Sequence, residues 1–180
     1  MAEYSDKEIL RIFNINPSKG FDLLVRKYQK RLYWHIRKMV IEHEDTNDVL
    51  QNVFIKVWKS LGKFREDSAL FTWLYRIATN DCLTFLKKKK TRLYLPIESV
   101  EQRLINMPDD NSLYSGDDIQ HKLQKAILTL PDKQRLVFNM RYFDEMKYKD
   151  MANILKTSTG ALKASYHHAV KKIERFIEED

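Results

Sequence analysis

Two long stretches of the chain repeat apolar residues among polar ones at the spacing of an α-helix. The first stretch includes a predicted helix that Asp45 or Thr46 caps and that runs to about Leu61. Asp67 or Ser68 is suited to cap the next helix, which ends in four lysines at 87–90. The apolar positions of the helix that ends near Leu61 crowd one side of a helical wheel: Val49, Leu50, Val53, Phe54, Val57, Trp58 and Leu61.

The second stretch, from residue 119 onward, predicts four shorter helices in succession. The first runs from Gln120 to Leu130, and Pro131 with Asp132 opens the second, because both residue types favour a helix N-terminus. The third spans about 147–155 and Ser158 caps the last. The predicted inward positions, in chain order, are Leu123, Ala126, Ile127, Leu130, Leu136, Val137, Met140, Phe143, Met151, Ala152, Leu155, Leu162, Tyr166, Ala169, Val170, Ile173, Phe176 and Ile177.

The segment between the two stretches is acidic and has no sustained apolar period. It holds Pro96, Pro108 and Gly116 together with carboxylates at 98, 101, 109, 110, 117 and 118. We therefore predict an all-α protein of two small helical domains, 1–92 and 119–180, joined by a flexible acidic linker at 93–118. Glycine and proline occur four times each, which favours long helices because sheets need many turn residues.

The charge of the chain suggests a nucleic-acid partner. The formal net charge is +7, and the basic residues lie largely outside the acidic segment, so both domains are more cationic than the total implies. Excess Lys and Arg suits a polyanion, whose condensed counterions are released on contact. A basic surface also serves solubility alone, so both interpretations stay open at this point.

Several functional classes find no support in the sequence. Cys82 is the single cysteine, which rules out an intrachain disulfide and any cysteine-rich zinc site. No phosphate-binding glycine loop, spaced metal set or nucleophile with an evident base occurs, so we expect no enzyme, cofactor or metal. The start lacks a secretory signal and no apolar run approaches the ~20 residues of a membrane span, so we expect a cytoplasmic protein.

The outward side of the last helix carries small and basic residues. Small side chains let a helix backbone approach a DNA groove, lysines can reach phosphates, and serine or histidine can bond to base edges. A short helix, a tight turn and such a second helix are typical of helix-turn-helix insertion into the major groove, although a solvated surface helix is the alternative. The outward residues are Ala161, Lys163, Ala164, Ser165, His167, His168, Lys171 and Lys172.

The first domain offers two candidate surfaces. One is the polar side of the helix that ends near Leu61, where a single Ile among polar residues suits protein docking, although a solvated face has the same pattern. The other is the aromatic-rich segment 64–76, whose rings lie close to two arginines. Aromatics beside cations can stack unpaired bases, although part of these rings must belong to the core. The two sets are Asp48, Gln51, Asn52, Ile55 and Lys59, and Phe64, Arg65, Phe71, Trp73, Tyr75 and Arg76.

Together these segments resemble the extracytoplasmic-function (ECF) sigma factors of bacterial RNA polymerase. The sequence DVLQNVFIKVW at 48–58 resembles the core-binding helix of their region two. Residues 64–80, including FTWLYRIA at 71–78, resemble the segment that melts and reads the minus-ten element. LPDKQR at 130–135 and residues 148–173 resemble region four, which reads the minus-thirty-five element. The match covers nearly the whole chain apart from the acidic segment.

This resemblance implies a sigma factor that binds RNA polymerase core and directs promoter-specific initiation. Its core contacts, to the clamp helices of the largest subunit, would be Asp48, Gln51, Asn52 and Ile55. The loop at 64–68 would hold a flipped minus-ten base. Arg76 and Asn80 would lie on the upstream side of the minus-ten element. The full set of minus-ten residues would be Phe64, Arg65, Asp67, Ser68, Phe71, Trp73, Arg76 and Asn80. The minus-thirty-five residues would be Ser158, Thr159, Ala161, Lys163, Ala164, Ser165, His168 and Lys172. An anti-sigma factor is a further implied partner.

The chain departs from the family pattern at a few of these positions. Asn52 stands where an acidic residue is usual, and Lys156 replaces the usual glycine of the helix-turn-helix turn. Ser165 and His168 stand where arginine, the usual guanine reader, is common, so we expect an atypical upstream element. The alternative function is a stand-alone helix-turn-helix regulator, which leaves the docking helix and segment 64–76 without a role. A protein-interaction adaptor is a third class, disfavoured by the charge and the last helix.

Overall fold

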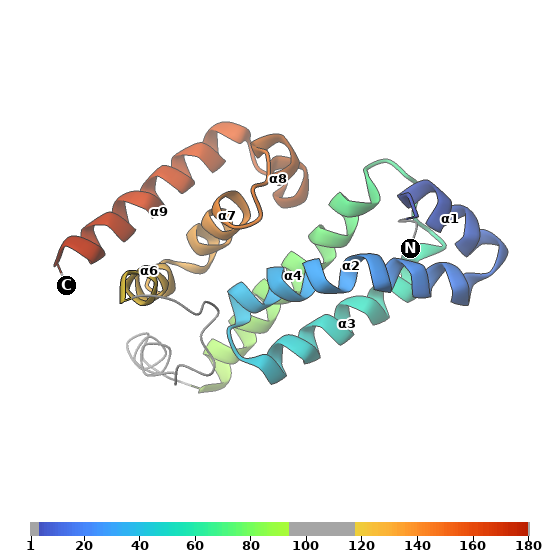
Figure 1. The fold of residues 1–180 in the computed structure, drawn as a ribbon, viewed down its shortest axis with the longest axis horizontal. Coiled ribbons are helices and arrows are strands. Elements are labelled where there is room, and N and C mark those ends of the chain that lie inside the picture. Colours follow the sequence, from blue (N-terminus) through green and yellow to red (C-terminus); the bar gives the residue numbers. More distant parts are fainter. Residues whose placement is uncertain (1–3, 94–117, 180) are drawn as a thin grey trace. The chain divides into compact units, whose positions relative to one another are not determined.

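The computed structural model of the chain describes residues 4–93 and 118–179, and all regular structure within these ranges is helical (Figure 1). The predicted all-α class is therefore confirmed. The chain divides into two compact units, Met1–Cys82 and Leu83–Asp180. Almost all of the predicted linker at 93–118 lies outside the described residues, and the predicted domain limits stay a prediction.

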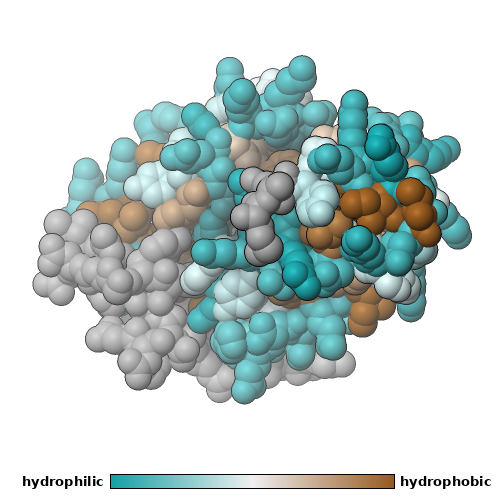
Figure 2. All heavy atoms as spheres, turned by 45° about the vertical axis from the view of Figure 1, so that its right-hand side comes forward, coloured by the Kyte–Doolittle hydropathy of each residue, from teal (hydrophilic) through white to brown (hydrophobic). Residues whose placement is uncertain are grey.

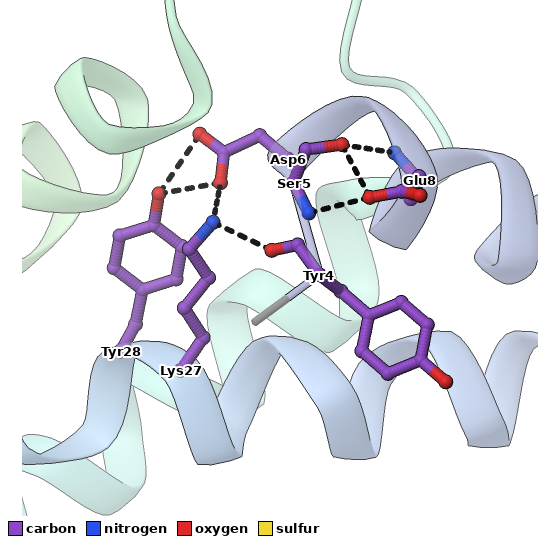
Figure 3. Close-up of polar contacts among 6 residues, drawn as sticks. All are labelled: Tyr4, Ser5, Asp6, Glu8, Lys27 and Tyr28. Carbon is purple, nitrogen blue, oxygen red and sulfur yellow. Dashed lines mark hydrogen bonds and ion pairs between the residues drawn. The ribbon is translucent and has the colours of Figure 1, made fainter. Parts of the chain in front are cut away.

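Helix α1, Asp6–Ile15, opens the first unit and was not predicted. The hydroxyl of Ser5 accepts a hydrogen bond from the Glu8 amide at 3.3 Å, while the Glu8 carboxylate accepts one from the Ser5 amide at 2.7 Å. These hydrogen bonds with Ser5 lower the pKa of Glu8. The Asp6 carboxylate ties α1 to α2, Pro17–Val40, by accepting hydrogen bonds at 2.8 Å from both Lys27 and Tyr28 (Figure 3). Burial, and then the hydrogen bond to Asp6, raise the pKa of Tyr28.

One residue joins α1 to α2. Asn16 ends α1, and its side-chain oxygen accepts a hydrogen bond from the Lys19 amide at 3.1 Å, which caps α2. Pro17 follows at the first helical position, where its fixed φ suits a helix start. The helices then touch at Gly20, because a Cβ built there would lie only 2.3 Å from the Cα of Phe13. Only glycine permits this close approach of the two backbones.

Helices α2, α3 (His43–Leu61) and α4 (Leu70–Leu93) enclose the core of the first unit. A buried polar contact crosses this core, where His35 Nε2 lies 3.0 Å from Thr79 Oγ1 and the His35 ring packs on Tyr75. The lone cysteine, Cys82, is also fully buried. The fully buried apolar side chains of the three helices are Leu24, Leu32, Ile36, Met39, Val53, Val57, Leu74, Ala78 and Cys82.

The predicted caps of α3 and α4 are wrong. Helix α3 begins at His43, and Thr46 lies inside its first turn, where its hydroxyl donates a hydrogen bond to the Glu42 carbonyl at 2.6 Å. Asp45 also lies in that first turn, where a carboxylate is stabilised by the helix dipole. In α4 the first backbone hydrogen bond runs to the carbonyl of Ala69, so Ala69 occupies the cap position in place of residues 67 or 68.

The second unit contains four described helices in succession: α6 (Asp118–Leu128), α7 (Asp132–Tyr142), α8 (Tyr148–Leu155) and α9 (Thr159–Glu179). The Arg141 guanidinium donates to the Met146 carbonyl at 3.1 Å and so braces the turn between α7 and α8. The predicted inward residues are buried or half-buried except Ile177, which is exposed. Four apolar residues that were not predicted are also buried: Leu128, Phe138, Met146 and Ile154. The core of this unit contains the cluster Ala126, Ile127, Leu130, Phe138, Ala169 and Ile173.

Candidate functional site

The outer face of α3 carries the predicted docking residues. Asp48, Gln51 and Asn52 are exposed, and Ile55, at 45% exposed, adds an apolar side chain among them. These four residues lie on the side of α3 opposite the buried Val49, Val53 and Val57, as predicted. The face therefore combines hydrogen-bonding groups with one solvent-exposed apolar side chain, which is the composition that protein interfaces use.

Trp58 extends this face, although the sequence pattern grouped it with the apolar side of the helix. Its side chain is 45% exposed. Phe21 of α2 and Phe13 of α1 pack against its ring edge-on, with centroid distances of 5.0 and 6.2 Å, so the ring is held in place on one side while it stays partly open to solvent. Ile15, at 79% exposed, also reaches the surface. Figure 2 shows a group of apolar atoms on the right side of the view, among hydrophilic ones.

The segment between α3 and α4 brings part of the predicted minus-ten set together. Phe64 and Trp73 are half-buried, and their rings lie with centroids 5.1 Å apart. Arg65 and Asp67 point to solvent and lie 3.7 Å apart, while Ser68 is half-buried. The loop therefore presents an aromatic wall next to exposed charged and polar groups, a chemistry suited to a nucleotide base and its phosphate.

Helix α4 carries the remaining minus-ten residues at increasing distance from this loop. Phe71 packs on Tyr75 with ring centroids 4.3 Å apart, and Tyr75 is buried against His35. Tyr75 is thus a core residue, whereas Phe71 is half-buried. Arg76 is half-buried and Asn80 is exposed. The aromatic residues of segment 64–76 are therefore divided between the core and the partly exposed surface, as expected from the sequence.

The second unit contains a helix-turn-helix at α8 and α9. Lys156 ends α8 in the left-handed conformation (φ 51°, ψ 45°), so lysine adopts the backbone shape for which glycine is usual. Ser158 then caps α9, since its hydroxyl accepts a hydrogen bond from the Ala161 amide at 3.2 Å, as predicted. The predicted minus-thirty-five residues on this segment are exposed, apart from the half-buried Ser165: Ser158, Thr159, Ala161, Lys163, Ala164, His168 and Lys172.

Tyr148 was not predicted as a site residue and lies beside the exposed face of α9. Its ring has the Arg141 guanidinium carbon 5.3 Å from its centroid and the Lys163 ammonium 5.9 Å from it. Nearby, burial raises the pKa of Tyr166. The sequence offered one signal for this role: Tyr148 is an aromatic residue at the first position of the short helix that precedes the basic helix α9.

The described residues contain no group of three or more potential metal ligands of the His, Cys, Asp and Glu types. Among the same residues, no helix is long and apolar enough to cross a membrane.

Comparison with known proteins finds two family models in order along the chain. Residues 24–92 match Sigma-70 region 2, and residues 120–173 match Sigma-70, region 4. The RNA polymerase sigma-H factor of Pseudomonas aeruginosa is 27% identical, with 99% of this chain and 96% of that protein covered. The ECF RNA polymerase sigma-E factor of Escherichia coli strain K12 is 26% identical, with 98% and 96% covered.

Two solved structures share the fold. A structure of CnrH in complex with the cytosolic domain of CnrY matches with a TM-score of 0.70 and 20% identity, and covers 97% of this chain and 98% of that one. A co-crystal structure of the sigma factor RpoE with the anti-sigma factor NepR from Bartonella quintana matches with a TM-score of 0.68 and 20% identity, over 90% and 99% of the two chains.

Proposed function

Because the chain belongs to the sigma-70 family as an extracytoplasmic-function sigma factor with regions 2 and 4, we propose that its two units supply separate contacts to RNA polymerase and to promoter DNA. The chain is a sigma factor for promoter-specific transcription initiation. The observation that carries this conclusion is the presence of both family regions in order on one chain. A stand-alone regulator is not favoured, because it would need only the second region.

The core-docking surface in this proposal is the outer face of α3. Asp48, Gln51 and Asn52 offer hydrogen-bonding groups, and Ile55 offers an apolar contact, to the clamp helices of the largest polymerase subunit. All four side chains are exposed, so binding needs no rearrangement of the α3 core.

The minus-ten element binds, in this proposal, along the loop at 64–69 and the first half of α4. The Phe64 and Trp73 rings form one wall for an extruded base, whose extraction from the duplex costs a few kcal/mol. Arg65, Asp67 and Ser68 complete the loop side, Phe71 lies at the start of α4, and Arg76 with Asn80 contact the upstream part of the element. The exposure of Arg65 and Asp67 and the pairing of the Phe64 and Trp73 rings support this assignment.

The minus-thirty-five element binds helix α9 in its major groove. The capped N-terminus of α9, at Ser158 and Thr159, points backbone N–H groups and a positive dipole end at the DNA. The small side chains of Ala161 and Ala164 let the α9 backbone approach the groove closely, while Ser165 and His168 face base edges. Lys163 and Lys172 reach phosphates.

Regulation by an inhibitor protein completes the proposal. The solved neighbours are a sigma factor bound to an anti-sigma factor and CnrH bound to the cytosolic domain of CnrY. We infer that an anti-sigma factor also binds this chain, and that it competes for the polymerase-docking or DNA-contacting surfaces described above.

Run-off transcription on a pooled promoter library, with purified core polymerase and with or without the protein, tests the function. Initiation that depends on the protein is expected, and its start sites report both promoter elements. If no initiation occurs while the protein alone binds specific duplex DNA, the chain is an autonomous regulator and the proposal fails.

Replacing Asp48 and Gln51 together by Ala tests the docking face. Affinity for core polymerase should fall, because both side chains lose their hydrogen-bonding groups. The matched control replaces Asp22 and Gln29, the same residue types on the exposed part of α2, and should leave core affinity unchanged. Equal affinities for both double variants would refute the assignment.

Replacing Phe64 by Ala tests the base pocket. Promoter opening, followed by permanganate reactivity of unpaired thymines, should be impaired more than closed-complex binding, because the ring is needed only once a base leaves the stack. An equal loss in both steps would show that Phe64 acts on the fold or on duplex binding.

A further inference from the structure

The outer side of α9 carries two neighbouring histidines, of which the assignments above use only the second. His167 and His168 are both exposed, and their ring centroids lie 6.1 Å apart. Successive residues of a helix point about 100° apart, so the two rings lie on either side of one line along α9. Ala164 stands on this line one turn before the pair, and Lys171 stands on it one turn after. Both imidazoles therefore flank the side of α9 that is proposed to enter the major groove.

The permanent charge of this part of α9 is low. From residue 159 to 172 the chain has three lysines, two histidines, no arginine and no Asp or Glu. The segment thus carries a formal charge of +3 with neutral histidines and +5 with protonated ones. The next carboxylate along the helix belongs to Glu174, about 10 Å along the axis from the pair. Within this segment only the histidines change charge between about pH 8 and 6.

The helices packed against α9 supply no partner to either imidazole among the described residues. They contact the opposite side of α9, through the buried Leu162, Ala169 and Ile173. The carboxylates of α7 and α8 belong to Asp132, which lies 3.3 Å from Arg135, and to Asp150 in the first turn of α8. Neither forms a hydrogen bond or an ion pair with an imidazole in the described part of the chain. The described side chains of α6, at 122–128, include lysines and no carboxylate.

Cations are the charged neighbours of both imidazoles along the outer side of α9. Lys163 lies one turn before His167, and its ammonium and the Arg141 guanidinium both lie against the Tyr148 ring. Lys171 and Lys172 follow one turn after the pair. Like charges oppose the protonation of an imidazole, whereas an anion bound beside it favours protonation. The proton occupancy of the pair therefore depends on whether DNA lies against this side of α9.

Histidine differs from arginine in the hydrogen bonds that it can make. Neutral imidazole has one donor and one acceptor, whereas imidazolium has two donors and a positive charge. Guanine presents two acceptors in the major groove, N7 and O6, while adenine and cytosine each present an amino donor. Imidazolium therefore suits guanine, and neutral imidazole can also accept from an amino group. Arginine, common in the family at the position of His168, keeps its charge over this whole pH range.

We propose that His167 and His168 make recognition of the minus-thirty-five element depend on protonation. As the pH falls from about 8 to 6, both rings become cations that only donate hydrogen bonds, so affinity for the element rises and base preference shifts toward guanine. At the upper end of this range the rings are neutral, and the charge contacts come from the lysines alone. The inference rests on the proposed function, since it takes α9 to be the helix that enters the groove.

The test measures binding of holoenzyme, assembled from core polymerase and the full chain, to duplex promoter DNA at pH 6 and pH 8 and at fixed ionic strength. The variant His167→Gln/His168→Gln removes both titrating rings and keeps polar side chains that favour a helix. The gain in affinity from pH 8 to pH 6 should be larger for wild type than for this variant, by about 5-fold for each histidine. A hydrogen bond from a charged donor is about twice as strong as one from a neutral donor, which sets this size. Comparing the two proteins at each pH cancels the titration of the polymerase.

Two further variants separate the alternatives. His43→Gln is the matched control, because His43 is an exposed histidine of the first unit, and it should keep the full pH dependence. A loss of pH dependence in this variant would place the titrating group outside α9. His168→Arg fixes one charge, so it should raise affinity at pH 8 and reduce the pH dependence to that of His167 alone.

Base preference supplies a readout that charge alone does not change. On a promoter set with a randomised upstream element, wild type should select more guanine at pH 6 than at pH 8, and the double Gln variant should select the same bases at both. The same gain in affinity for wild type and the double variant overturns the proposal. A pH effect of equal size on a scrambled upstream element also overturns it, because the rings would then contact phosphates of any sequence. Failure of wild type to initiate at either pH is a separate result, since it refutes the proposed function itself.

Discussion

Replacing Gly20 by Ala tests the packing of α1 on α2 directly. A Cβ at this position would lie 2.3 Å from the Cα and 2.4 Å from the backbone nitrogen of Phe13, whereas ordinary contacts begin near 3.4 Å. Because these are backbone atoms, no side-chain rotation relieves the clash, and α1 must move by about 1 Å. Overpacking of this kind costs about 1–3 kcal/mol. If α1 detaches, the loss extends to the burial of Ile9 and Phe13, about 3–6 kcal/mol as an upper bound.

The same substitution elsewhere in the chain supplies the controls. Gly160→Ala meets no atom within 4 Å in the first turn of α9 and should stabilise its unit by up to about 0.5–1 kcal/mol, because alanine loses less entropy in a helix. Gly62→Ala meets only the edge of the Phe13 ring at 3.9 Å and should be nearly neutral.

Hydrogen exchange by peptide, combined with urea unfolding, measures these effects, since two units need not unfold as one. Gly20→Ala should accelerate exchange in residues 6–15 while exchange in 159–179 stays as in wild type. Unchanged exchange in 6–15 together with an unchanged free energy of unfolding would show that the two backbones do not touch.

Three further changes follow from the described geometry. Lys156→Gly should raise the free energy of unfolding in urea by about 0.5–1 kcal/mol. The left-handed conformation costs most residues about 1–2 kcal/mol and glycine nothing, but glycine also loses more backbone entropy on folding, which offsets part of the gain. A lower stability would contradict this. Tyr28→Phe should flatten the decline of stability above pH ~10. The pKa of Tyr28 is higher in the folded protein than in the unfolded chain, so its stabilising effect is complete below the unfolded pKa and is lost as the pH rises toward the folded pKa. Melting temperatures measured from pH 8 to 11 would show the difference. His168→Ala should change base preference at the upstream element without changing core affinity, measured on a randomised promoter set, whereas a uniform loss across sequences would make His168 a phosphate contact.

The helical class and much of the inward-facing pattern followed from periodicity, because buried apolar residues at 3.6-residue spacing leave a strong signal. The second unit shows this best, since the predicted inward residues are nearly all covered. The Ser158 cap was predictable for a different reason, because serine is among the residues preferred at the N-cap position of a helix. The roles of the candidate site residues stay predictions.

The wrong or missing predictions had different causes, one tertiary and two local. Trp58 fits the apolar side of a helical wheel, yet rings that come from α1 and α2 fill the space beside it. Helix α1 itself was missed, although Ser5 and Glu8 form a capping box that the sequence displays. The start of α3 was misplaced because Thr46 lies inside the first turn and its hydroxyl donates back to the carbonyl of Glu42, the N-cap residue, a hydrogen bond that serine and threonine side chains also make within helices.

The buried position of Cys82 makes the thiol a chemical reporter of the first unit. A thiolate reacts only when exposed, so in the folded protein this single cysteine is protected from alkylation and oxidation. Labelling by a thiol reagent then requires that α4 open, and an opening free energy of about 5 kcal/mol slows the reaction by a factor of several thousand. The unmodified protein thus carries its own probe of conformational opening, which can be read while polymerase, DNA or an inhibitor is bound.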